Sequence, residues 1–146
     1  MTTQTNQKGF TIIELLIVIV VIGILATITA IALGGANERA RDAARESDAR
    51  SLRQALETYY TLGNSVYPTL ADMNSETFRD EHFQGLDEEV FTDPNGTTSD
   101  LTDDENAVNQ YIYEPGGCDV DLGGCTSYTL TVNLESGDAI VRENQQ

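Results

Sequence analysis

Residues 10–33 read FTIIELLIVIVVIGILATITAIAL, and in this run of 24 residues only Glu14 is charged. About 20 apolar residues are enough for a helix to cross a bilayer. The many β-branched residues would weaken a helix in water, but in lipid a helix satisfies its own backbone polar groups. The run therefore predicts a membrane-spanning or otherwise apolar-packed helix, which we place at residues 10–36.

The segment before this run is short and polar, MTTQTNQKG. An ordinary secretory signal has a charged start, a shorter apolar region and a small-residue cleavage site after it, and this chain fits that pattern poorly. Five arginines lie in residues 39–53, just beyond the apolar run. The positive-inside rule alone would place that side in the cytoplasm. Charge by itself leaves the orientation open.

Glu14 is the most informative residue of the apolar run, because an unpaired carboxylate inside a membrane costs several kcal/mol or more. In one interpretation it lies at the helix start, where the helix dipole tolerates an acid. In the other it pairs with a positive charge at the same depth. A cut between Gly9 and Phe10 would create such a charge, and the pairing fits best between neighbouring, staggered chains.

The residues around this cut resemble a known family. KGFTIIELLIVIVVIGILATI, which begins at Lys8, is similar to the class III signal of type IV pilins and of the pseudopilins of type II secretion. The resemblance covers about residues 7–35. It implies that a prepilin peptidase removes the leader, residues 1–9, by cutting after Gly9, and that Phe10 is then methylated. It also implies that Glu14 pairs with a neighbouring subunit's terminal amine during assembly.

What the resemblance implies for function is a structural protein and not an enzyme. We expect a type IV pilus subunit, held in the cytoplasmic (inner) membrane as a precursor and then assembled into a helical homo-oligomeric filament on the cell surface. Its partners would be prepilin peptidase, the pilus assembly platform and minor pilins. The alternatives are a pseudopilin of a type II secretion system, a minor pilin, or a membrane-anchored acidic binding domain that does not polymerise.

The composition of residues 37–62 also favours a helix. Its apolar residues recur at spacings of three and four and would form one stripe facing a soluble domain: Ala40, Ala44, Leu52, Ala55, Leu56, Tyr59 and Leu62. Gly63-Asn64-Ser65 is a helix stop signal. We therefore expect one long helix over about residues 10–62.

The remainder predicts a small antiparallel sheet. Alternating apolar and polar residues indicate strands at 110–114, 127–134 and 139–142, and a short helix is expected at 76–82. The sheet would pack against the second half of the long helix. This gives an α+β fold, in agreement with the type IV pilin fold that the resemblance implies, with a soluble head domain at residues 37–146.

The head is strongly acidic. The net charge of −16 arises entirely beyond Arg53, where there are nineteen acidic residues and two basic ones, Arg79 and Arg142. Such a surface repels nucleic acid phosphate, so we expect no direct nucleic acid binding. It can equally serve solubility or a salty medium.

Two further features concern the head's loops. Cys118 and Cys125 suggest one disulfide in an exported protein, with two free thiols as the alternative. Calcium prefers six to eight oxygen ligands, and the loops carry weak candidates for it: Asp93, Asn95, Asp119 and Asp121. The alternative is a solvated acidic loop, and we expect no cofactor. The sequence contains no recognisable catalytic motif.

Overall fold

The computed structural model describes residues 9–144, and for residues 32, 33, 63 and 64 the backbone alone. The chain forms two compact units, one ending at Asn37 and one beginning at Glu38. Helix α1, Ile12–Tyr59, contributes to both units. The fold is α+β, a long amino-terminal helix followed by a small antiparallel sheet, as predicted.

In the first unit, the α1 backbone continues without a break through Gly23, Gly34 and Gly35. Two threonines in this segment keep their hydroxyl groups satisfied within the helix. The Thr27 hydroxyl donates to the Gly23 carbonyl at 2.9 Å, and the Thr29 hydroxyl donates to the Leu25 carbonyl at 2.8 Å. These hydrogen bonds to the preceding turn let polar residues lie in an apolar helix without an unsatisfied hydroxyl.

In the second unit, α1 is followed by a π-helical turn, η1 (Tyr60–Asn64). Ser65 then leaves the helix in the left-handed conformation, with φ of 52°. The predicted stop signal is therefore where the helical segment ends. Three short helices follow: α2 (Leu70–Met73), α3 (Glu76–His82) and the 3-10 helix η2 (Glu88–Phe91). The predicted helix at 76–82 is confirmed.

The sheet has three antiparallel strands in the order β1-β2-β3: Ile112–Gly116, Ser127–Asn133 and Ala139–Glu143. The second and third strands lie within a residue of their predicted bounds. The first begins two residues later than predicted, because the backbone next to it pairs elsewhere. The Thr102 amide donates to the Tyr111 carbonyl at 3.1 Å, and the Tyr113 amide donates to the Thr102 carbonyl at 2.7 Å.

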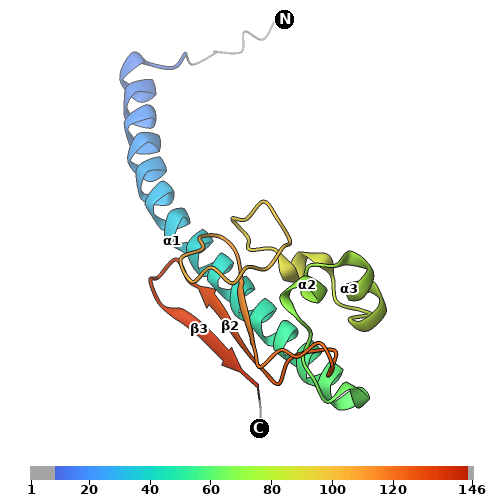
Figure 1. Cartoon of the computed structure of the whole chain (residues 1–146). Helices are drawn as coiled ribbons and strands as arrows, with labels where there is room; N and C mark the ends of the chain where they lie inside the picture. The colour runs from blue at the N-terminus through green and yellow to red at the C-terminus, as the bar shows by residue number, and fades with distance from the viewer. Residues whose placement is uncertain (1–8, 145–146) are drawn as a thin grey trace, which may run out of the picture. The chain divides into compact units, whose positions relative to one another are not determined.

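The core of the second unit lies between α1 and the sheet. Along β2, Tyr128, Leu130 and Val132 alternate inward and are buried. They belong to one cluster with Leu52 and Leu56 of α1. In Figure 1, β2 and β3 lie on one side of this part of α1, and α2 and α3 lie on the other.

The predicted apolar stripe of α1 is partly wrong. Leu52 and Leu56 are buried, and Ala55 and Tyr59 pack partly against the core, but Ala40, Ala44 and Leu62 are exposed. The buried positions that replace them are Ala49 and Arg45, which continue the same face toward the amino terminus. An arginine takes the core face here because acidic side chains of the head surround it.

Candidate processing and assembly site

The predicted cleavage point lies at the start of the described chain. Gly9 and Phe10 precede α1 and are exposed, and the Phe10 side chain is 85% exposed. Lys8 and the rest of the leader, residues 1–8, lie outside the described residues. The peptide bond between Gly9 and Phe10 is therefore exposed and non-helical, which leaves it accessible to a peptidase. Cleavage and methylation at this position stay predictions.

Glu14 is the acidic member of a helix cap. The Thr11 amide and the Thr11 hydroxyl both donate to Oε2 of Glu14, at 2.8 and 2.7 Å. The Glu14 amide donates to the Thr11 hydroxyl at 3.3 Å. This is the reciprocal arrangement of a capping box, which satisfies amide groups that the first helical turn leaves without partners. Within one chain, Glu14 therefore lies at the helix start and takes part in its cap, as the first interpretation expects.

This capping box was not predicted from the sequence, although the sequence contains a local pattern for it. Thr11-Ile-Ile-Glu14 is the S/T-x-x-E pattern that precedes an apolar helix, and it identifies Thr11 as the residue before the first turn. The carboxylate of Glu14 remains exposed while it holds this cap. It can therefore still face a positive charge from outside the chain, so the cap and the predicted intersubunit pairing do not exclude each other.

The apolar residues that follow are exposed throughout. Every large apolar side chain from Phe10 to Ile31 is between 48% and 87% exposed. Among the described residues, α1 is the one helix that is long and apolar enough to cross a membrane. Exposed apolar surface that is continuous over several turns indicates a membrane or protein interface, because water disfavours it strongly.

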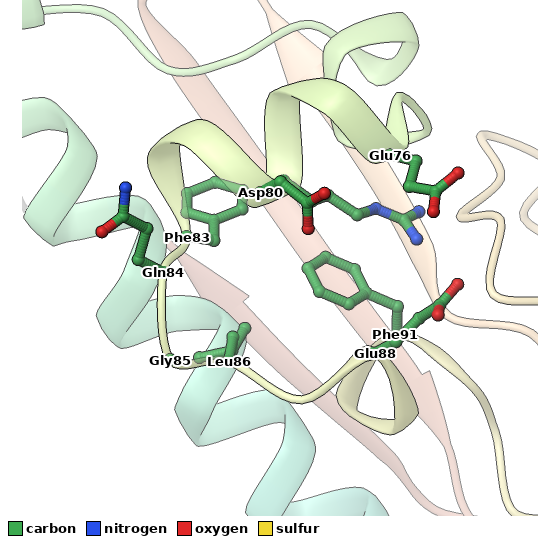
Figure 2. Close-up of a pocket in the computed structure, with 9 residues that line it drawn as sticks. Glu76, Asp80, Phe83, Gln84, Gly85, Leu86, Glu88 and Phe91 are labelled. Carbon is green, nitrogen blue, oxygen red and sulfur yellow. The ribbon is translucent and has the colours of Figure 1, made fainter.

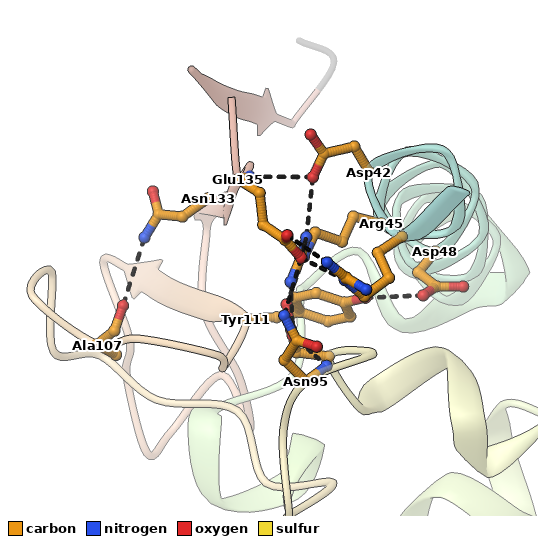
Figure 3. A network of polar contacts seen from close by, with 10 residues as sticks. Asp42, Arg45, Asp48, Asn95, Ala107, Tyr111, Asn133 and Glu135 are labelled. Carbon is orange, nitrogen blue, oxygen red and sulfur yellow. Dashed lines mark hydrogen bonds and ion pairs between the residues drawn. The ribbon is translucent and has the colours of Figure 1, made fainter. Parts of the chain in front are cut away.

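A second polar site lies in the head, around the buried Arg45 (Figure 3). Its guanidinium group donates to both carboxylate oxygens of Asp93, at 2.7 and 2.9 Å. It also donates to Asp42 at 2.8 Å and to Glu135 at 3.0 Å. Arg45 therefore joins α1 to the turn after η2 and to the turn between β2 and β3. Paired and hydrogen-bonded in this way, a buried charge is tolerated.

The network around Arg45 extends to both sides. The Arg41 guanidinium donates to Glu135 at 2.6 Å, and the side-chain amide of Asn95 donates to the same carboxylate at 2.8 Å. Hydrogen bonds from Arg41, with further ones from Arg45 and Asn95, lower the pKa of Glu135 to about 2. On the other side, the Tyr111 hydroxyl donates to Asp48 at 2.7 Å, and burial above all raises the pKa of Tyr111. Periodicity and composition gave no signal for this network.

The calcium candidates are divided between two loops. Asp93 binds Arg45 through both carboxylate oxygens. Its Oδ1 also accepts a hydrogen bond from the backbone amide of Asn95 at 2.8 Å. Asp119 accepts the Asp121 amide at 2.8 Å within its own loop. No group of three or more His, Cys, Asp or Glu side chains that could hold a metal ion occurs among residues 9–144. The weak calcium candidates stay untested, and an unchanged melting temperature between chelator and millimolar calcium would exclude them.

The two cysteines are joined. Cys118 and Cys125 form a disulfide with their Cα atoms 3.8 Å apart. It closes the loop that carries Val120, which is 97% exposed, while Cys125 itself is buried. The Cys125 amide and carbonyl pair with the backbone of Tyr67, so the disulfide ties this loop to the chain that follows α1.

Comparison with known proteins agrees with the geometry of the amino terminus. A family model described as the prokaryotic N-terminal methylation motif matches residues 4–30. The chain is 41% identical to the type II secretion system core protein G of Vibrio cholerae and to that of Escherichia coli, each over 69 residues, 47% of either chain. It is 43% identical to the protein of the same name from Aeromonas hydrophila over 66 residues.

These matches are partial. They cover 45–47% of this chain, and the chain spans about half the length of the curated relatives it matches. No solved structure gives a significant match to the chain. The exposed Gly9–Phe10 bond, Glu14 and most of the apolar segment of α1 fall within the matched residues 4–30. The chain thus carries the prokaryotic N-terminal methylation motif, the shared signature of type IV pilins and type II secretion pseudopilins.

Proposed function

We propose that this protein is a pseudopilin, a structural subunit of the pilus-like filament of a type II secretion system. The observation that carries the proposal is the exposed apolar segment of α1, most of which lies within the methylation motif and which contains one carboxylate, Glu14. A helix of this kind needs an apolar environment, first a membrane and then the helices of neighbouring subunits.

The proposed sequence of events follows from the chain's amino terminus. The precursor is inserted in the inner membrane by the apolar segment of α1, and a prepilin peptidase cuts between Gly9 and Phe10. The new amino group of Phe10, once methylated, stays positively charged. It pairs with Glu14 of a neighbouring subunit as the apolar helices bundle. Once the helices have left the membrane they stay bundled, because returning each large apolar side chain to water would cost about 1.5–3 kcal/mol.

The relatives favour secretion over a surface pilus. The proteins named above are type II secretion system core proteins, which supports the pseudopilin alternative better than our primary expectation of a type IV pilus subunit. The role is structural in either case, and we propose no catalytic activity. Deletion of the gene distinguishes the two: a pseudopilin mutant retains secreted proteins inside the cell, whereas a pilin mutant loses surface pili and secretes normally.

Two substitutions test the role of Glu14. Thr11 and Glu14 share the helix cap, so both Glu14→Ala and Thr11→Ala weaken it. If Glu14 acts in assembly, Glu14→Ala abolishes sedimentable filaments while Thr11→Ala, which keeps the carboxylate, still forms them. Equal loss in both variants would show that Glu14 serves only the cap. Normal filaments from Glu14→Ala as the sole subunit would contradict the proposal.

The mass of the mature amino terminus tests the processing step independently. We expect a chain that begins at methylated Phe10. An intact Met1 on the mature protein would rule out the cut. If the protein is instead a membrane-anchored binding domain that does not polymerise, it should remain in the membrane fraction and form no filaments under any condition.

A further inference from the structure

The surface arginines of the head gather in one place. Of the described arginines, Arg41 and Arg45 are bound to Glu135 and Asp93, and Arg79 is buried. Of the remaining four, three line a hollow of about 420 Å³ between α1 and β3, which we call the basic hollow; its lining is Arg50, Arg53, Gln54, Glu57 and Arg142. Three arginines against one glutamate make it positive in an acidic head.

The charges of the basic hollow are only partly neutralised within the chain. Arg50 pairs with Glu46 one turn earlier on α1, in an exposed contact of the kind that contributes little. Glu57 is engaged by the head, because the hydroxyl groups of Tyr128 and Tyr67 donate to it at 2.9 and 3.2 Å. The lone carboxylate of the hollow is therefore held by tyrosines of the core.

A second hollow has the opposite charge. It has a volume of about 340 Å³ and lies between α3 and η2 (Figure 2). Phe83 and Phe91 form its buried floor, and three exposed carboxylates surround it: Glu76, Asp80 and Glu88. We call it the acidic hollow.

The acidic hollow contains one arginine, which is already used by the head. The Arg79 guanidinium lies 4.1 Å from the centre of the Phe91 ring, and it donates to the carbonyl oxygens of Met73 and Ser99. Because Arg79 donates to neutral carbonyl groups, the rim keeps an excess of negative charge. Carboxylates above an aromatic floor favour a guanidinium group, which has an apolar stem and a planar cationic end.

The two hollows are separate surfaces, and no residue lines both of them. The basic hollow uses Arg50, Arg53 and Glu57, toward β3. The segment from His82 to Leu86, which the acidic hollow shares in part, faces Ser51, Ala55 and Thr58, and Gln54 lies between the two faces of the helix. Figure 1 shows β3 and α3 on opposite sides of the helix. Two different, complementary patches on one chain can join copies head to tail, and head-to-tail contacts that do not close produce open helical filaments.

We propose that the basic hollow of one subunit receives the acidic hollow of the next copy in the filament, so that Arg53 and Arg142 face the rim carboxylates, chiefly Glu88. This inference rests on the proposed filament and adds a contact between heads to the contact between apolar helices. Such a contact matters in a homopolymer of strongly acidic subunits, since the whole chain has a net charge of −16 and removal of the leader takes away the basic Lys8. Heads that repel one another gain a defined approach where the surface arginines meet carboxylates.

Crosslinking in filaments made from the full chain tests the contact directly. Cells express two differently tagged variants together, Arg53→Cys and Glu88→Cys, and sheared filaments are treated with a flexible bis-maleimide. The native cysteines do not react, because they are joined in the disulfide. We expect crosslinked dimers that carry both tags. The matched control replaces Arg53→Cys by Arg39→Cys, an exposed α1 position outside the basic hollow, and should give at least about tenfold less product.

Charge reversal tests whether the contact stabilises the filament. Arg53→Glu and Glu88→Arg should each lower the yield of sedimentable filaments by about tenfold, equivalent to about 1.4 kcal/mol. The double variant, which restores opposite charges, should recover most of the yield. Arg39→Glu changes net charge as Arg53→Glu does, and should have little effect. Circular dichroism of each purified variant confirms that the head remains folded.

The outcomes separate this inference from the proposed function. In one outcome, wild-type filaments form and require Glu14, but Arg53→Cys crosslinks to Glu88→Cys no better than the control Arg39→Cys does. The proposed contact between heads is then wrong, and the pseudopilin proposal stands. The head contact is equally wrong if the double charge reversal fails to recover yield although both single variants fold. If the wild-type chain forms no filaments in a secreting cell, the pseudopilin proposal itself fails.

Discussion

Helix α1 places two kinds of side chain in opposite surroundings. In its first part, apolar side chains from Ile12 to Ile31 are about half exposed or more, and their surroundings must come from outside the chain. In its second part, Leu52 and Leu56 are buried, and even the charged Arg45 is buried against carboxylates of the same chain. One helix thus has a part that is complete only in a membrane or filament and a part that is complete within the head.

The difference shows where each part obtains its stability. In the first part, helix formation satisfies the hydrogen bonds of the backbone. Its apolar side chains find no partners within the chain, and lipid or neighbouring subunits would have to supply them. For the second part, the sheet and the loops supply apolar partners, and Asp93, Asp42 and Glu135 supply charge. Separating the two parts of α1, or removing single partners of its second part, tests this difference.

Removing residues 1–37 should have the largest effect. The remaining head keeps its core, the Arg45 network and the disulfide, so we expect a folded, soluble monomer by light scattering and circular dichroism. The full chain should instead need detergent or assembly, because its apolar segment is exposed. A truncated head that aggregates or unfolds would show that the head depends on the apolar segment, and the contrast between the two parts would fail.

Arg45→Met removes the cation at the centre of the head's charge network. Asp93, 3% exposed, is then left as a buried unpaired carboxylate, and breaking such a pair should reduce the free energy of unfolding by about 3–5 kcal/mol. Urea denaturation of the head measures this loss. Arg41→Met is the matched control: its side chain is 34% exposed, and we expect a loss of about 1 kcal/mol or less. Equal losses would mean that burial of Arg45 does not matter.

Loss of the disulfide should have an intermediate effect. Cys118 and Cys125 are seven positions apart, and closing a loop of this size stabilises the folded chain by roughly 2.5 kcal/mol through the entropy of the unfolded state. Reductant should lower the free energy of unfolding of the head by about that amount. The Cys118→Ala/Cys125→Ala variant should show the lower value at once and should not respond to reductant.

A smaller effect concerns Glu135 and acid. Its folded pKa, about 2, lies below the ordinary value of 4.5. Ionised Glu135 therefore stabilises the folded head above pH 4.5, and this contribution is lost as the pH falls from 4.5 toward 2. In Glu135→Gln the contribution is absent at every pH. We expect the free energy of unfolding to fall less steeply in this window for the variant than for wild type; parallel curves would show that the Arg41 and Arg45 contacts do not hold the carboxylate.

Much of the fold was predictable because it depends on local pattern. The apolar run, the helix at 76–82 and the second and third strands follow from composition and alternation over a few residues. The bounds of β1 did not, since Tyr111 pairs with Thr102, a partner that no local pattern indicates. Within the candidate site, the capping box at Thr11 and Glu14 had a local signal in the T-x-x-E pattern, whereas the network of Arg45 had none.

That this chain has an apolar helix with one carboxylate near its start, within a methylation motif, follows from local sequence, because apolarity, charge and spacing are properties of consecutive residues. Which face of the second part of α1 is buried depends instead on contacts between distant parts of the chain. Arg45 can lie there because Asp93 and Glu135, 48 and 90 residues further along the chain, converge on it. Whether a charge is tolerated in a core depends on such partners, and their convergence is a property of the folded chain alone.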